Sequence, residues 1–160
     1  MKSVYFAGPD VFSPDYPRLI SEIKAMCAAN GLEPLLPGDK DLATSEEIFH
    51  FNLSLIKAAD GIIANLNPFR GAIEPDSGTV FECAYAFAGG KWVIGYLDDQ
   101  RDMLTKLRQT EIGPSNSGLL CRDGTVVEDF NLPLNLMLAH GLTKVVDCLQ
   151  DAVHLAAAYQ

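Results

Sequence analysis

Short apolar segments alternate with longer amphipathic segments along the chain, and this alternation restricts the possible fold more than any other feature. Strand-like runs occupy residues 4–8, 32–36, 62–66, 91–97 and 144–146. Between them, apolar residues recur with helical spacing at 17–30, 44–59, 78–89, 100–109, 133–139 and 150–159. Strands that alternate with helices form a parallel sheet with helices on both faces. The sequence therefore predicts the α/β class: a single doubly wound domain over residues 1–160 with a mainly five-stranded parallel sheet.

In sheets of this flavodoxin-like or Rossmann-like type, ligands bind beyond the carboxyl ends of the strands, near the point where the strand order reverses. Four loops follow predicted strands at that edge, and we expect the site to lie among them: 8–15, 37–43, 67–77 and 98–101. One helix start has a local signature, because Thr44 and Glu47 have the spacing of a capping box. The first loop has no G-x-G-x-x-G pattern, which argues against a dinucleotide-binding domain.

Charge and composition exclude several classes of protein. The formal net charge is −9 and Lys and Arg form no cluster, so a nucleic acid polymer is not an expected partner. No apolar run approaches the roughly 20 residues of a membrane-spanning helix, and the N-terminus lacks a signal-peptide pattern, so we expect a cytoplasmic protein with no membrane partner. There is no C-x-x-C pair and no histidine at metal-ligand spacing, and we expect no metal.

The densest chemical signal is the segment from Asp76 to Ala86, which follows a predicted strand and loop and opens a helix. Asp76 or Ser77 can cap that helix, and Gly78 allows a close backbone approach. Glu82 then lies about one turn inside the helix among small and apolar neighbours, where a carboxylate is costly unless it is used or paired. From the residues alone, an exposed Glu82 on a solvated helix face and a purely structural Asp76 remain open alternatives.

Four segments together resemble one family over nearly the whole chain. They are Tyr5-Phe6-Ala7-Gly8-Pro9-Asp10-Val11-Phe12, the stretch from Asn52 to Gly71, Asp76-x-Gly78-Thr79-x-x-Glu82 and Asn135-Leu136-Met137. They occur in the order, and on the predicted elements, of the nucleoside 2-deoxyribosyltransferases. The resemblance implies an enzyme that exchanges the base of 2′-deoxyribonucleosides for a free purine or pyrimidine base, with no cofactor.

The resemblance also implies roles for the catalytic groups. Glu82 would be the nucleophile that forms a covalent deoxyribosyl intermediate, in a double displacement that retains the configuration at C1′. Asp76 would protonate the departing base and deprotonate the incoming one. Tyr5 would donate a hydrogen bond to Glu82, although an aromatic residue in a core strand needs no such role.

The remaining implied site residues bind substrate. Phe12 would stack on the base, Asp39 would contact the base edge and Gly78 would let the backbone approach the substrate. From the residues alone, Phe12 could instead anchor its loop, and Gly38-Asp39 is also an ordinary turn. Where some family members carry an aspartate that contacts the sugar, this chain has Asn52, which can still bond to a hydroxyl but carries no charge.

The resemblance further implies a homo-oligomer, at least a dimer, in which Asn135 and Met137 enter a neighbour's site. The alternative is that Met137 belongs only to the apolar stripe of its own helix.

Two other functions remain open from the sequence. One is a 2′-deoxynucleoside 5′-phosphate N-hydrolase, which transfers the sugar to water; Arg70 is the nearby cation that could hold its phosphate, whereas Asp10 and Asp15 in the first loop disfavour one. The other is a non-catalytic nucleoside-binding module, because a fold alone does not fix a function. Such a module would need neither Asp76 nor Glu82.

Overall fold

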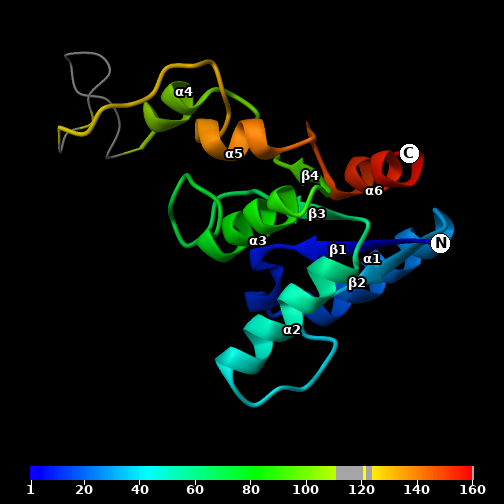
Figure 1. Ribbon diagram of the computed structural model, residues 1–160. Coiled ribbons are helices and arrows are strands. Elements are labelled where there is room, and N and C mark those ends of the chain that lie inside the picture. Colours follow the sequence, from blue (N-terminus) through cyan, green and yellow to red (C-terminus); the bar gives the residue numbers. More distant parts are fainter. Residues whose placement is uncertain (111–120, 122–123, 160) are drawn as a thin grey trace.

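The computed structural model describes residues 1–110, 121 and 124–159, and within them the sheet is entirely parallel (Figure 1). Its strands are β1 (Lys2–Ala7), β2 (Leu32–Leu35), β3 (Gly61–Asn65), β4 (Trp92–Tyr96) and β5 (Lys144–Val146), in the spatial order β2-β1-β3-β4-β5. The helices are α1 (Tyr16–Ala29), α2 (Ser45–Ala58), α3 (Ser77–Ala88), α4 (Met103–Leu107), α5 (Leu136–Gly141) and α6 (Leu149–Ala158), with a short 3-10 turn at Pro9–Phe12. The predicted α/β class and the five-stranded parallel sheet are confirmed.

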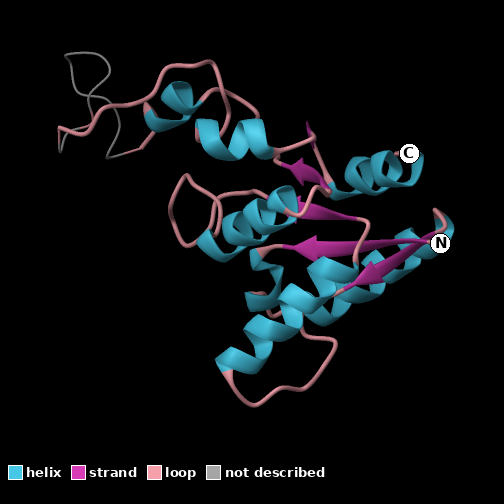
Figure 2. Ribbon diagram, in the orientation of Figure 1, coloured by secondary structure: helices cyan, strands magenta, loops and turns pink. Residues whose placement is uncertain are grey.

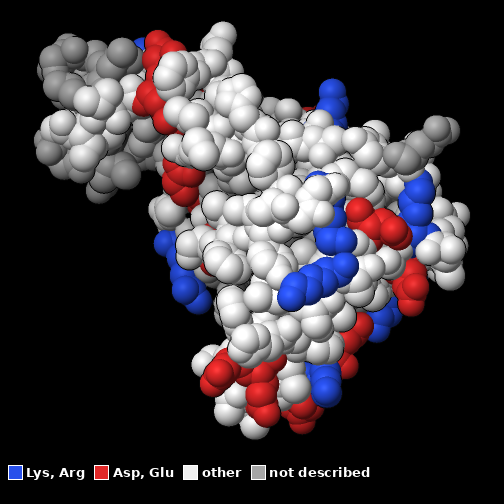
Figure 3. All heavy atoms as spheres, in the orientation of Figure 1, with Lys and Arg blue, Asp and Glu red and all other residues white. Residues whose placement is uncertain are grey.

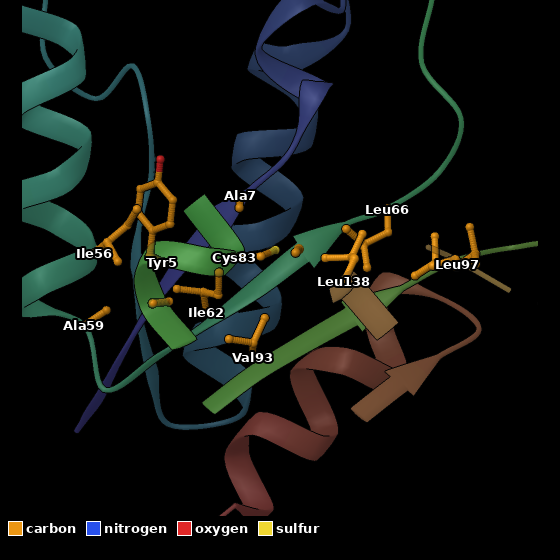
Figure 4. Packing of buried hydrophobic residues seen from close by; sticks show 13 residues of the cluster. Tyr5, Ala7, Ile56, Ala59, Ile62, Leu66, Cys83, Val93, Leu97 and Leu138 are labelled. Atoms are coloured by element: carbon orange, nitrogen blue, oxygen red, sulfur yellow. The ribbon is translucent and has the colours of Figure 1, made fainter. Parts of the chain in front are cut away.

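Alternate residues of the central strand β1 face two separate hydrophobic layers. Tyr5 and Ala7 pack with Ile56 of α2 and Cys83 of α3, whereas Val4 and Phe6 pack with residues of α1 and α6. The first layer also receives Leu138 of α5 (Figure 4). Helices therefore cover both faces of the sheet, as the doubly wound prediction requires (Figure 2). Tyr5 packs in the layer that contains residues of α2 and α3.

The strand order reverses between β1 and β3, which are direct neighbours in the sheet. Their register pairs Ala7 with Ala64, so the loops after both strands leave the same edge. The capping box predicted at the start of α2 is present, because the Thr44 hydroxyl accepts from the Glu47 backbone N–H and the Glu47 carboxylate accepts from the Thr44 backbone. The capping box was predicted because it depends on local sequence, whereas no strand order was predicted from the sequence.

The helix predicted over 100–109 is shorter, and α4 spans only Met103–Leu107. Asp102 is the reason, because its carboxylate accepts a hydrogen bond from the Thr105 backbone N–H at 2.9 Å and so fixes the helix start there. Arg101, just before the cap, donates its guanidinium to Asp99 instead. No helix in the described ranges combines the length and the apolar character needed to cross a bilayer.

Candidate functional site

A cavity of about 570 Å³ opens at the carboxyl edge of the sheet, beside the reversal point. Its wall comes from the loop after β1, the segment after β2, the first half of α2 and the first turns of α3. Five of the residues singled out from the sequence line it together: Phe12, Asn52, Asp76, Gly78 and Glu82. Segments up to 70 positions apart in the chain are therefore brought to one site by the topology.

Glu82 and Tyr5 are joined by a short hydrogen bond. The Tyr5 hydroxyl donates to Glu82 Oε1 at 2.6 Å, the length of a charge-assisted O–H···O⁻ bond. The Tyr5 ring is fully buried in the first layer, with its hydroxyl oxygen directed away from the packed side chains (Figure 4). Packing in the core therefore fixes the position of the Tyr5 hydroxyl, and the hydrogen bond from this hydroxyl fixes the orientation of the Glu82 carboxylate.

The Glu82 carboxyl has an unusual acidity. Its pKa is raised from 4.5 to about 7, mainly by burial. The nearby charge of Asp76 also raises this pKa, and hydrogen bonding from Tyr5 and Asn52 partly offsets the rise. Burial, followed by the charge of Glu82, raises the pKa of the Tyr5 hydroxyl, so this group stays a neutral donor. A carboxyl group with a strongly shifted pKa in a cleft is a mark of a functional site.

Asp76 combines a structural contact with a place in the cavity wall. It caps α3, since its Oδ2 accepts from the Thr79 backbone N–H at 2.9 Å and from the Thr79 hydroxyl at 3.1 Å. Gly78 explains how the carboxylate fits, because a Cβ at this position would lie 3.0 Å from Asp76 Oδ2. The capping role and the exposure to the cavity therefore coexist in one side chain.

Phe12 lies at the cavity in a stack with two residues of the loop after β3. Its ring is 62% exposed and sits 5.6 Å from the ring of Phe69, with the Arg70 guanidinium 5.1 Å from the Phe12 ring centre. Arg70 adopts a left-handed backbone conformation (φ 51°), followed by Gly71 at φ 78°. The stack supports an otherwise exposed aromatic ring on the cavity wall, and no local sequence pattern indicates the Phe12–Arg70 contact.

Three predicted residues lie elsewhere in this chain. Asp39 is outside the cavity wall, and its carboxylate pairs with Lys24 at 3.2 Å. Asn135 caps α5 by accepting from the Met137 backbone N–H at 3.0 Å. Met137 is 77% exposed and lines a separate apolar pocket of about 450 Å³ between α3 and α5.

Sequence reasoning missed some groups that line the cavity. Lys40 and Asp41 follow Asp39 directly and reach the wall that Asp39 does not. Tyr16 also lines it and donates its hydroxyl to the Pro37 carbonyl at 2.6 Å. The loop at 37–43 was expected to contribute, but a one-residue difference within a loop has no signal in the sequence.

The charged side chains Lys40, Asp41, Asp76 and Glu82 line the cavity. No group of three or more His, Cys, Asp or Glu residues suited to a metal ion occurs in the part of the chain that the structure describes. On the face drawn in Figure 3, acidic side chains gather around the start of α2 and beside α4, with a few basic ones scattered between them.

Comparison with solved structures finds several proteins with the same fold. A 2-deoxyribosyltransferase from Leishmania mexicana superposes with a TM-score of 0.84 at 36% identity, over 100% of this chain and 99% of that one. A 2-deoxyribosyltransferase from Bacillus psychrosaccharolyticus (TM-score 0.58, 16% identity, 95% of this chain and 90% of that one) and a CMP N-glycosidase from Clostridium botulinum (TM-score 0.54, 15% identity, 99% and 100%) share the fold.

A curated relative is an uncharacterized protein of Schizosaccharomyces pombe, 35% identical over 114 residues, which are 66% of this chain. The chain spans about half (54%) of the length of that relative. The model of the nucleoside 2-deoxyribosyltransferase family matches residues 4–137, a range that holds most of β1, the strands β2 to β4, α3 and the residues that line the cavity. On that match, the chain belongs to the nucleoside 2-deoxyribosyltransferase family.

Proposed function

We propose that this protein transfers 2-deoxyribose from a 2′-deoxyribonucleoside to a free purine or pyrimidine base, by two successive displacements at C1′. The observation that carries the proposal is the Glu82 carboxylate, held at 2.6 Å by the Tyr5 hydroxyl in a cavity that Asp76 also lines. A half-buried carboxylate in a fixed orientation is suited to nucleophilic attack, and a second carboxyl group nearby is suited to proton transfer. Neither step requires a cofactor.

In the first displacement, the ionised Glu82 carboxylate attacks C1′ and forms an ester bond. The C1′–N bond of the nucleoside breaks, and its electron pair leaves with the base. The protonated form of Asp76 gives its proton to the departing base and becomes a carboxylate. Phe12, supported by Phe69 and Arg70, provides the aromatic surface on which the base stacks.

In the second displacement, an incoming base attacks C1′ from the face that the first base has left. Asp76 takes the proton from the nitrogen of the incoming base as the new C1′–N bond forms, and the ester bond to Glu82 breaks. Two inversions at one carbon return the original configuration. The preference for deoxyribose follows from the transition state, which resembles an oxocarbenium ion and forms more readily without an electron-withdrawing 2′-hydroxyl.

We also propose that Asn135 and Met137 complete the site of a second copy of the chain. The exposed side chain of Met137 and the neighbouring Phe87, which is 60% exposed, border the apolar pocket between α3 and α5. An exposed apolar surface of this kind is typical of a protein interface. Neither Asn135 nor Met137 lines the cavity of its own chain, which supports a role across such an interface.

Hydrolysis of deoxynucleoside monophosphates is the second candidate function, and one observation favours it. Arg70 lies against Phe12 at the cavity, and among the described residues its guanidinium has ring contacts but no ion pair or hydrogen bond. Its donors are therefore available for a phosphate.

One experiment separates the candidate functions. 2′-Deoxyinosine or thymidine is incubated with excess adenine, and the products of the wild type, Glu82→Ala and Asp76→Asn are separated by chromatography. Transfer yields deoxyadenosine, and Glu82→Ala loses it by on the order of a thousandfold or more. Free base without deoxyadenosine, from nucleosides or their 5′-monophosphates, would instead indicate a hydrolase. Recovery of unchanged ligand would indicate a binding module.

A further inference from the structure

Asn52, on α2, carries a buried polar atom without a partner. Its Oδ1 has almost no exposed surface and accepts no hydrogen bond from any described residue. An unpaired buried carbonyl destabilises the fold, so its orientation needs an explanation. The side chain lines the same cavity as Glu82, and its helix packs against α3.

The nitrogen of the Asn52 amide explains why Oδ1 is left without a partner. The Asn52 and Glu82 side chains line the same cavity, on the packed helices α2 and α3, and the Asn52 amide is close enough to the Glu82 carboxylate to lower its pKa by hydrogen bonding. The amide nitrogen only donates, and an ionised carboxylate only accepts. Turning the amide over would bring Oδ1 against the carboxylate oxygen, so Glu82 determines the orientation that leaves Oδ1 unpaired.

We infer that Asn52 is a positioning residue, which together with the Tyr5 hydroxyl holds the Glu82 carboxylate ionised and oriented for attack on C1′. This inference rests on the proposed function and gives Asn52 a task different from the sugar contact expected from the sequence. The two donors come from different elements, β1 and α2, so together they fix both the position and the rotation of the carboxylate. Both are neutral, so neither adds a charge to the cavity. An aspartate at position 52 would set a second anion against the nucleophile.

Other groups near Glu82 act in the opposite direction. Burial and the charge of Asp76 raise the pKa of Glu82, and the bonds from Tyr5 and Asn52 lower it. Tyr16, from α1, also interacts electrostatically with Glu82. The remaining titratable groups that face Glu82 or line the cavity are Cys83, Lys40 and Asp41. Without the Asn52 donor, only the Tyr5 hydrogen bond would lower the pKa of Glu82 against the effects of burial and of the Asp76 charge. The pKa should therefore rise.

The test compares Asn52→Leu and Asn52→Asp with the wild type, and Ser54→Ala serves as a control on the exposed side of the same helix. Two quantities are measured against pH: the kcat/KM of transfer, and the ¹³C signal of the Glu82 carboxyl group, identified with Glu82→Gln. We expect Asn52→Leu to move the midpoint of the acidic limb upward by about one pH unit, and Asn52→Asp further. The Ser54→Ala midpoint stays in place, and activity of Asn52→Leu recovers at high pH.

Unchanged midpoints in both Asn52 variants would overturn the inference, because a purely structural role or a sugar contact alters the rate without moving the limb. If either variant unfolds, Asn52→Ser replaces it and is judged in the same way. The carboxyl signal needs no turnover. A wild type without transfer activity therefore contradicts the proposed function alone, whereas a Glu82 signal that ignores position 52 contradicts this inference alone.

Discussion

The Tyr5 hydroxyl and the Glu82 carboxylate, 77 positions apart in the chain, lie 2.6 Å from each other where the central strand meets α3. A hydrogen bond to a charged group contributes about 1.5–3 kcal/mol. Tyr5→Phe should therefore lower kcat for transfer by roughly 10- to 100-fold and change KM for the donor nucleoside little.

The matched control is Tyr85→Phe, on the same helix as Glu82. Among the described residues, the Tyr85 hydroxyl makes no hydrogen bond; its ring instead stacks against Phe81. Steady-state kinetics should separate the two variants clearly. An equal loss of kcat in both, or a Tyr5→Phe enzyme with full activity, would contradict the role of the bond.

The pH dependence of transfer follows from the pKa of Glu82, which burial raises to about 7. Attack on C1′ requires the ionised form, and this form is lost as the pH falls below the pKa. We expect kcat/KM to fall about tenfold per pH unit on the acidic side of a midpoint near 7. A rate that stays flat from pH 8 down to about 5 would show that Glu82 is ionised well below this range.

The same raised pKa makes Glu82 a cost to stability at neutral and higher pH. Its pKa is about 7 in the folded chain against an ordinary 4.5, so the folded state binds the proton more tightly. The stability that this group contributes is fully present below about pH 4.5 and is lost as the pH rises through about 7. Glu82→Gln should then be more stable than the wild type by about 3 kcal/mol at pH 8.

Urea unfolding of the two proteins at pH 4 and pH 8 measures this difference. The difference in unfolding free energy should nearly vanish at the lower pH. A constant difference at both values would point to altered packing instead of the charge.

Two inactive variants should restore each other if Asn135 enters a neighbouring site. Glu82→Ala lacks the nucleophile, and Asn135→Ala lacks the group given to the neighbour. In a mixed dimer, one site has the intact Glu82 of one chain and the intact Asn135 of the other. Random pairing makes half of the dimers mixed, so co-expression should return about a quarter of the wild-type activity. Activity no higher than that of the separate variants would contradict a contribution of Asn135 to the neighbouring site.

Arg70 should matter for binding more than for chemistry. Its guanidinium lies 5.1 Å from the centre of the Phe12 ring and stabilises the proposed stacking surface. A cation–π contact contributes about 0.5–1 kcal/mol at an exposed site, so Arg70→Ala should raise KM for the acceptor base by roughly two- to fivefold. Arg18→Ala, an exposed arginine paired with Glu22, is the control. A large fall in kcat specific to deoxynucleoside monophosphates would favour the phosphate-binding alternative.

Local signals in the sequence predicted much of this structure, and long-range contacts account for what they missed. The Thr44–Glu47 capping box and the strand alternation depend on near neighbours, and both are present. The spacing from Asp76 to Glu82 correctly indicated a helix start with a carboxylate one turn inside it. The hydrogen bond from Tyr5 was expected only from the family resemblance, because no local pattern links it to Glu82.

Contacts within loops had still less signal. The exact path of the 37–43 loop decides which aspartate reaches the cavity. Asp39 pairs with Lys24, whereas Asp41 lines the cavity. The unpaired Asn52 Oδ1 depends on how α2 packs against α3. Side-chain contacts between distant segments are fixed by tertiary packing, which a single sequence does not reveal.

Because Asp76 both caps α3 and lines the cavity, folding and the proposed proton transfer place separate demands on one side chain. An alanine at this position removes the cap, at a cost of about 1 kcal/mol, together with the acid. An asparagine keeps an oxygen for the Thr79 backbone N–H and removes only the titratable proton. Evolution or engineering toward a different proton chemistry can therefore pass through asparagine without first having to rebuild the helix.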